Sequence, residues 1–238
     1  MRSGFPGIPQ EGIEFFRGLA RHNNRDWFLP RKQIFEEQVK QPMRELVSAV
    51  NHAMMEFAPD YVTDPDKAIY RIYRDTRFSK DKTPYKTHLA ANFRWQGGGR
   101  HECAGYYFAI SHKNAAIGGG LYMPEPEVLR ALRNHIADNP AQFRKLIGSA
   151  TVRKLFGEMQ GEQLSRVPKG FSADHPAADL LRFKQFIFYT EQPPELAVTP
   201  AFLREIVQRF RAIAPFVAFL NAPLAPARKK IDVRELLL

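Results

Sequence analysis

Residues 105–122 read GYYFAISHKNAAIGGGLY, and they give the clearest indication of the fold class. Residues 105–111 are mostly aromatic and aliphatic, and residues 115–122 are small and aliphatic, so each half predicts a β-strand. Only His112, Lys113 and Asn114 separate the halves, and Lys113-Asn114 is typical of a tight turn. A connection this short joins antiparallel neighbours, because a parallel crossover needs about a dozen residues or more. The stretch therefore predicts an antiparallel hairpin.

Further strands are expected on both sides of this hairpin. Residues 68–74 (AIYRIYR), 88–95 (HLAANFRW) and 185–189 (QFIFY) are rich in residues that favour strands. Apolar residues at helical spacing predict helices over 10–22, from Asp26 to 57 with an interruption at Pro42, from Pro124 to 136, over 140–147, over 177–182 and from Pro200 onward. Strands grouped between helices predict an α+β fold, in which an antiparallel meander of about four to five strands packs with helices from the N- and C-terminal parts.

The chain of 238 residues is long enough to form one large core. We expect residues 1–222 to form a single α+β domain and the basic residues 223–238 to form a loose tail. The first residues lack the apolar run of a signal peptide, and no membrane-spanning apolar run occurs, so we expect a soluble protein that does not contact a membrane. The single cysteine, Cys103, fits a reducing cytoplasm. No pattern in the sequence indicates an oligomeric state.

Positive charge is concentrated in one segment of the chain. The whole chain has 35 Lys and Arg against 25 Asp and Glu, a net charge of +10. Residues 71–88, RIYRDTRFSKDKTPYKTH, contain six Lys and Arg and two Asp, which leaves +4. Arg offers a planar pair of donors to phosphate or carboxylate, and Lys offers a mobile positive charge. We therefore expect this segment to bind an anionic small molecule, and the sequence leaves enzymatic activity open.

The candidate binding residues lie in this segment. The connection over 75–87 is longer than an ordinary hairpin loop, and long connections are often binding loops. In a regular strand, alternation places Arg71 and Arg74 on opposite faces, so one ligand should not contact both unless a bulge or a helical turn brings them together. His88 is a candidate acid or base, because histidine titrates near neutral pH. The predicted ligand-binding residues are Arg71, Arg74, Asp75, Arg77, Lys80, Asp81, Lys82, Tyr85, Lys86 and His88.

Two other interpretations of the segment remain open. In the first, the arginines and aspartates form a structural ion network that binds no ligand. In the second, the lysines follow a nucleic-acid backbone and Tyr73, Phe78 or Tyr85 stacks on bases, although no known nucleic-acid-binding signature occurs. The histidines form no HExxH motif and the cysteine has no partner, so neither a metal nor a cofactor is expected. Residues 118–120 (GGG) lack a phosphate-loop fingerprint, which favours close backbone packing there.

Several stretches of the chain resemble a known family. IYRDTRFSKDKTPYKTH at 72–88 resembles the signature of the domain of unknown function 2461 family, conserved hypothetical bacterial proteins of similar length. The resemblance continues over 5–28, 118–127 and 166–186 in matching order. It implies no activity, cofactor or catalytic residue. By this resemblance, the family signature falls on Arg71, Arg74, Asp75, Arg77, Phe78, Asp81, Lys82 and Tyr85.

Overall fold

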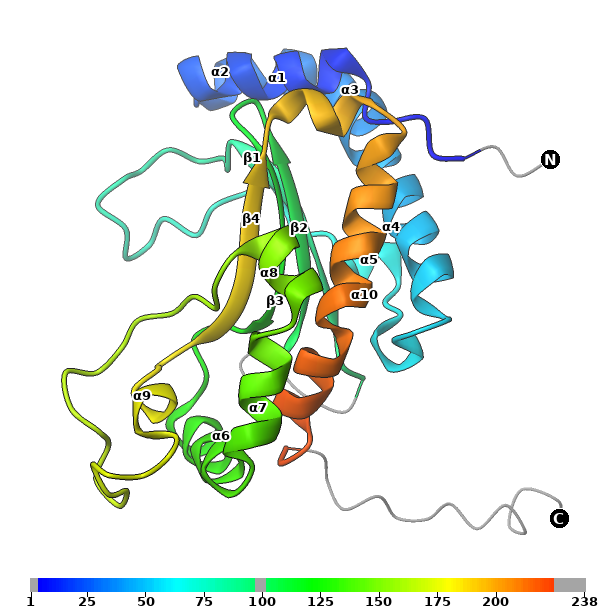
Figure 1. Ribbon diagram of the computed structural model, residues 1–238. Helices are drawn as coiled ribbons and strands as arrows, with labels where there is room; N and C mark the ends of the chain where they lie inside the picture. The colour runs from blue at the N-terminus through cyan, green and yellow to red at the C-terminus, as the bar shows by residue number, and fades with distance from the viewer. Residues whose placement is uncertain (1–3, 97–101, 225–238) are drawn as a thin grey trace, which may run out of the picture.

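Four antiparallel strands form one sheet in the computed structural model of the chain, which describes residues 4–96 and 102–224. Neighbours in the sheet are also neighbours in the chain, in the order β1-β2-β3-β4 (Figure 1). The predicted α+β fold with an antiparallel meander is therefore confirmed. The strands are β1 (His88–Arg94), β2 (Gly105–Ser111), β3 (Ala115–Leu121) and β4 (Phe186–Gln192).

Helices occupy most of the chain before the sheet. The second helix begins at Arg25, one residue before the predicted start at Asp26, because Asn24 caps it and the Asn24 side-chain oxygen accepts the N–H of Trp27 at 2.9 Å. Pro42 lies in the first turn of α4, where a helix does not need its missing N–H. These elements are α1 (Gln10–Arg21), α2 (Arg25–Phe28), η1 (Leu29–Arg31), α3 (Lys32–Ile34), the π-helix η2 (Phe35–Lys40), α4 (Gln41–Met54), η3 (Pro59–Tyr61) and α5 (Pro65–Ala68).

The remaining helices follow β3, and four of them lie between β3 and β4 in the chain. Pro126, and not the predicted Pro124, begins the first of these helices. The last helix continues through Pro215 without interruption. These elements are α6 (Pro126–Asp138), α7 (Pro140–Ile147), α8 (Ala150–Phe156), α9 (Ala178–Leu181), η4 (Pro194–Val198) and α10 (Ala201–Asn221).

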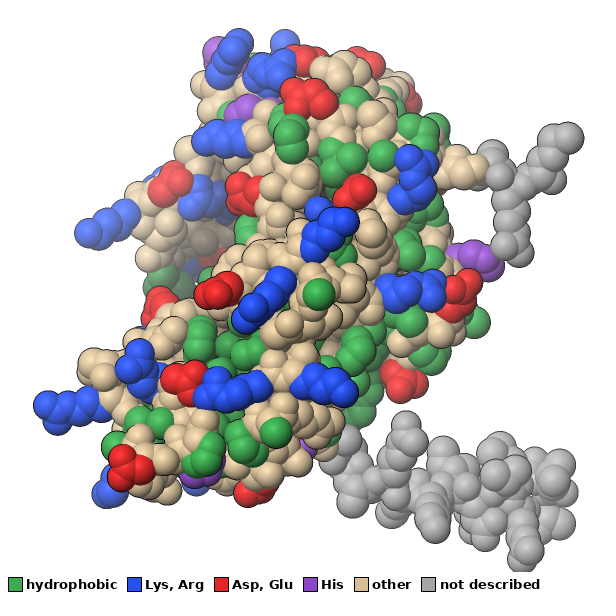
Figure 2. Space-filling model, in the orientation of Figure 1, with side chains coloured by type: hydrophobic (Ala, Val, Ile, Leu, Met, Phe, Trp, Pro, Cys, Tyr) green, Lys and Arg blue, Asp and Glu red, His purple; other side chains and the backbone are tan. Residues whose placement is uncertain are grey.

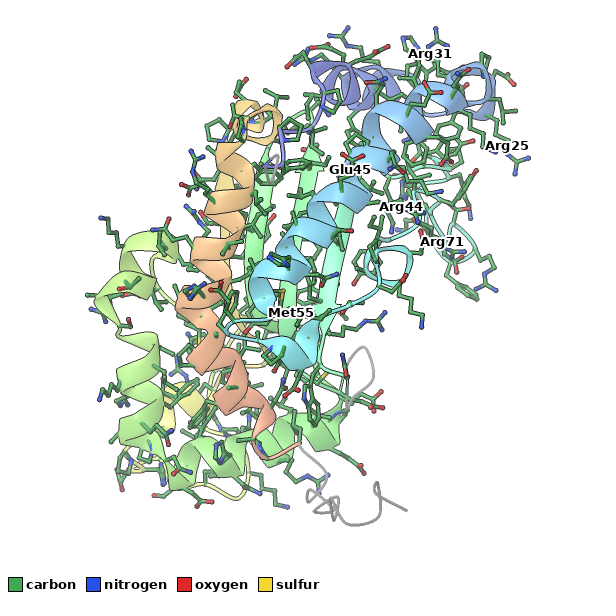
Figure 3. All side chains as sticks on the ribbon, turned by 90° about the vertical axis from the view of Figure 1, so that its right-hand side faces the viewer. Arg25, Arg31, Arg44, Glu45, Met55 and Arg71 are labelled. Atoms are coloured by element: carbon green, nitrogen blue, oxygen red, sulfur yellow. The ribbon has the colours of Figure 1, made fainter. Side chains whose placement is uncertain are left out.

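The main core lies between the sheet and the helices on one of its faces. Figure 3 shows α4 and α10 side by side in front of the strands. Phe210 of α10 packs on the sheet, with its ring centroid 4.9 Å from that of Tyr106 and 5.7 Å from that of Phe93. A Cβ on Gly119 would lie 2.7 Å from the Cδ1 atom of Ile213, so glycine lets α10 approach β3 closely.

Residues 68–74 do not form the predicted strand. Ile69 makes one antiparallel bridge to Ala91 of β1, and the N–H of Tyr70 donates to the carbonyl oxygen of Ala90 at 2.9 Å. The chain then turns away, and Tyr73 bridges Tyr85 instead. Ala68 still belongs to helix α5, and composition could not show that the residues after it divide their pairing between two partners. Residues 72–86 thus form a separate arm, which we call the 72–86 hairpin.

The opposite edge of the sheet is also bridged. Gln160 pairs with Ile187 of β4 through two backbone hydrogen bonds, of 2.8 and 3.2 Å. Each outer strand therefore has a partner on its outer side for at least one residue.

No helix within residues 4–96 and 102–224 is long and apolar enough to cross a membrane. Residues 225–238 lie outside the described residues. The division into a domain over 1–222 and a loose tail over 223–238 therefore stays a prediction.

Candidate ligand-binding cleft

The sheet turns one face toward the helices and the other toward two projecting segments. Along β1, Leu89, Ala91 and Phe93 are buried on the helix side, so strand alternation directs His88, Ala90, Asn92 and Arg94 to the other side. In Figure 1, the 72–86 hairpin and residues 157–177 project on this other side, away from α4 and α10. We call it the open face of the sheet.

A cavity of about 610 Å³, which we call the sheet-face cleft, lies on the open face. Small residues from each of the first three strands line its floor. Three tyrosines pack against a cluster of three alanines on this face: Tyr70, Tyr107 and Tyr189. The floor residues are Ala90, Gly105, Gly118, Gly119 and Gly120.

Three basic side chains line the sheet-face cleft, and all come from β1 or the residues just before it: Lys86, His88 and Arg94. The Nζ atom of Lys86 lies 5.2 Å from the ring centroid of Tyr70. Arg94 makes no salt bridge within residues 4–96 and 102–224. No Asp or Glu of the described chain lines the cleft. One wall of the cleft therefore carries positive charge without an acidic neighbour in the lining.

Burial changes the pKa of two side chains in the cleft. Loss of solvent lowers the pKa of His88, and the positive charge of Lys86 lowers it further. Loss of solvent also raises the pKa of Tyr107 to about 12, with a smaller contribution from Tyr70. At neutral pH the imidazole is therefore mainly uncharged, and the Tyr107 phenol keeps its proton.

The hydroxyl groups of the three tyrosines differ in their partners. The Tyr70 hydroxyl accepts a hydrogen bond from the Asn92 amide at 3.0 Å. The Tyr189 hydroxyl donates to the Glu191 carboxylate at 3.0 Å. Among the described residues, the hydroxyl of Tyr107 has no such partner, so this protonated group can donate to a ligand in the cleft.

The arginines of the 72–86 hairpin are paired within the hairpin. Arg74 forms a salt bridge with Asp81 and also donates to Thr83. Arg77 donates to both carboxylate oxygens of Asp75, at 3.0 and 2.8 Å. These bonds lower the pKa of Asp75 and of Asp81 to about 2. Figure 2 shows Lys and Arg side chains on this projection, but each of its two aspartates already has an arginine partner.

Other predicted binding residues lie away from the cleft. Arg71 lines a separate cavity of about 270 Å³ beside Lys32 and Lys40, and Figure 3 shows it next to α4. Tyr85 is 3% exposed, and its ring stacks on Phe28 with centroids 4.1 Å apart. Lys80 is exposed on the hairpin, as is Lys82, whose Nζ atom donates to the carbonyl oxygen of Thr76 at 2.9 Å.

The structure therefore brings only Lys86 and His88 of the ten predicted residues into the sheet-face cleft. Sequence reasoning missed Arg94, although a signal was available: in a strand that begins at His88, every second residue shares its face. It also missed Tyr107, which no motif marks. The location of these side chains does not test whether they bind a ligand, so ligand binding by the ten residues stays a prediction.

A comparison with family models identifies the family of this chain. The model for the family described as Conserved hypothetical protein (DUF2461) matches residues 11–219. The chain belongs to this family. Searches among curated proteins and among solved structures gave no match. Every residue that lines the cleft of this DUF2461 protein lies inside the matched range.

Metal-ligand side chains do not cluster in the described part of this DUF2461 chain. Within residues 4–96 and 102–224, no group of three or more His, Cys, Asp or Glu side chains could hold a metal ion.

Proposed function

We propose that this DUF2461 protein binds a small anionic ligand, bearing a phosphate or carboxylate group, in the sheet-face cleft. One observation supports this proposal above the others: Lys86, His88 and Arg94 line a cavity that no described acidic side chain lines. Positive charge on low-dielectric walls attracts anions and raises their local concentration. A volume of about 610 Å³ also falls within the range of roughly 300–1,000 Å³ that is usual for small-molecule sites.

Each basic group would contribute in a different way. The Arg94 guanidinium offers planar paired donors that match two oxygens of one anionic group. Lys86 lies at the opposite end of β1 from Arg94, so its compact charge on a flexible stem would meet a different part of the ligand. The protonated Tyr107 hydroxyl supplies a neutral donor near the centre of the floor.

For the outer end of the 72–86 hairpin we infer a structural role instead. Arg74 pairs with Asp81 and Arg77 with Asp75, so each of these arginines has an internal carboxylate partner. An external anion would have to compete with a carboxylate that is already in place. This observation favours the ion-network interpretation for these four residues, while Lys86 and His88 serve the cleft.

The two locations can be separated by a matched pair of substitutions. Arg94→Gln removes a cation from the cleft, and Arg77→Gln removes one from the hairpin. We expect Arg94→Gln to weaken the binding of inorganic phosphate about tenfold or more, because hydrogen bonds to charged groups contribute about 1.5–3 kcal/mol. Arg77→Gln should leave the affinity unchanged. Isothermal titration calorimetry at low ionic strength measures both.

The reverse result would move the site. Phosphate affinity that survives Arg94→Gln but falls in Arg77→Gln would place anion binding on the hairpin and contradict the cleft. A third result would favour nucleic acid: tight binding of a single-stranded oligonucleotide that weakens steeply with salt and depends on Lys80 and Lys82.

A further inference from the structure

The sheet-face cleft has different chemistry on its two sides. The strand register places Arg94, Gly105, Gly120 and Ile187 in one row across the four strands. The row therefore begins with a cation, crosses two positions without side chains and ends with an aliphatic residue. Because neighbouring strands lie about 4.8 Å apart, roughly 14 Å separate the backbones at its two ends.

The two glycines in this row are required by backbone packing. A Cβ on Gly105 would lie 2.5 Å from the carbonyl oxygen of Phe93, and one on Gly120 would lie 2.1 Å from that of Phe186. Gly120 also has a φ of +127°, which other residues rarely adopt. Packing alone explains why glycine stands here. Its consequence for the cleft is a strip of backbone, two strands wide, that carries no side chain of its own.

A strained turn just after β3 presents two exposed side chains at the end of the cleft that also holds Arg94. Tyr122 and Met123 both line it, and they remain 60% and 57% exposed. Met123 has a φ of 52°, and no other non-glycine residue within 4–96 and 102–224 has a positive φ. A side chain held in this region costs energy and often marks a functional position. Strain and exposure thus coincide at one rim of the cleft.

We propose that the anionic ligand also carries a flat aromatic ring. Its charged group binds at Arg94, and its ring lies on the glycine strip against Tyr122 and Met123. This inference rests on the proposed function and names the ligand class: aryl carboxylates or aryl phosphates. A rigid ring fits this strip and loses little conformational freedom on binding, whereas a flexible chain must be ordered. Rings also pack well with tyrosine faces and with methionine sulfur.

Pairs of probes that differ only in the ring test this class. Inorganic phosphate is compared with phenyl phosphate, and acetate with benzoate, while hexanoate supplies a flexible chain of similar size. We expect the ring to tighten binding about tenfold or more within each pair, with hexanoate between acetate and benzoate. Equal affinities of phosphate and phenyl phosphate would contradict the proposal that the ligand carries an aromatic ring, and would leave the proposed anion site unaffected. Hexanoate binding as tightly as benzoate would contradict the aromatic ring too. Absence of binding by every probe would remove the proposed function as well.

Two substitutions locate the ring, and a third controls for exposed aromatic residues in general. Tyr122→Ala removes an exposed ring, and Met123→Gly removes a side chain where glycine adopts the backbone conformation readily, so both variants should fold. Phe78→Ala removes a ring that is 96% exposed on the hairpin and does not line the cleft. We expect Tyr122→Ala and Met123→Gly each to reduce the affinity that the ring adds by about threefold or more, with unchanged phosphate affinity. Phe78→Ala should change neither the affinity that the ring adds nor the phosphate affinity. If the Tyr122→Ala/Met123→Gly double variant keeps the full affinity that the ring adds, the ring does not bind against Tyr122 and Met123.

Discussion

His88 is the group in the cleft that titrates nearest to neutral pH. Its pKa lies below the ordinary value of 6.5, because burial and Lys86 both disfavour the charged ring. The unfolded chain therefore takes up this proton first as the pH falls. His88 contributes stability above pH 6.5, and this contribution is lost as the pH falls through the lowered pKa. An anion beside His88 would act in the opposite direction, but Arg94 lies six residues further along β1, about 20 Å away.

This distance predicts that an anion bound at Arg94 leaves the protonation of His88 almost unchanged. Between pH 8 and 5.5, we expect benzoate affinity to stay nearly constant, because charges about 20 Å apart are largely screened at physiological ionic strength. Benzoate remains ionised over this range, so its own charge stays constant. Calorimetry in two buffers with different ionisation enthalpies detects any proton uptake. Uptake near the His88 pKa that disappears in His88→Gln would place the charged group at the His88 end of β1 and contradict binding at Arg94.

At the residue scale, the sequence identified the charge but not its arrangement. Lys86 and His88 are found in the cleft because they lie where the basic segment meets a strand that was recognised from its composition. Asp75 and Asp81 were weighed both as site residues and as ion-pair partners, and only the folded hairpin shows that each meets an arginine. The positive φ of Met123 was not predictable, because local sequence preference strongly favours such a conformation only for glycine, Asn and Asp.

The Asn23 side chain joins the 72–86 hairpin to the helical layer by two hydrogen bonds. The Asn23 amide donates to the carbonyl oxygen of Tyr85 at 2.9 Å and accepts its N–H at 3.0 Å. It thereby satisfies both backbone groups of a residue whose ring is buried against Phe28. The position of Lys86, one residue later, depends on this attachment.

Asn23→Ala should therefore destabilise the protein. We expect the free energy of unfolding to fall by about 1–3 kcal/mol, because the N–H and C=O of Tyr85 lose their partners. Urea denaturation measures the change. Arg77→Gln is the matched control within the same hairpin: its ion pair is exposed, and such pairs contribute little, so no measurable loss is expected. Equal losses in both variants would contradict the attachment by Asn23 and favour a stabilising ion network.

Element prediction succeeded where each segment has one set of partners. The strands that became β1, β2 and β3 were located to within about a residue, because each pairs along its whole length. Residues 68–74 have an equally strong strand composition. They fail to form a strand because Ile69 bonds to β1 while Tyr73 bonds to Tyr85 across the hairpin. Such a division of partners depends on tertiary contacts, which the local pattern does not contain.

At the scale of the whole molecule, one aromatic core joins the N-terminal helices, the sheet and α10. We expect residues 1–222 to unfold as a unit, with the same midpoint by tryptophan fluorescence and by circular dichroism. Phe210→Ala should lower the free energy of unfolding by about 3–5 kcal/mol and shift both signals together, because its ring contacts Phe93 and Tyr106. Two separate midpoints would show that the chain contains more than one cooperative unit.

The bridges outside β1 and β4 also affect how separate copies of the protein meet. An uncovered outer strand offers a row of free backbone donors and acceptors to the sheet of another molecule, which is a route to aggregates and fibrils. Ile69 and Gln160 each occupy part of one such row. We therefore expect the sheet to resist growth by strand addition at both ends. Opening of the segment before the 72–86 hairpin would expose β1 to aggregation.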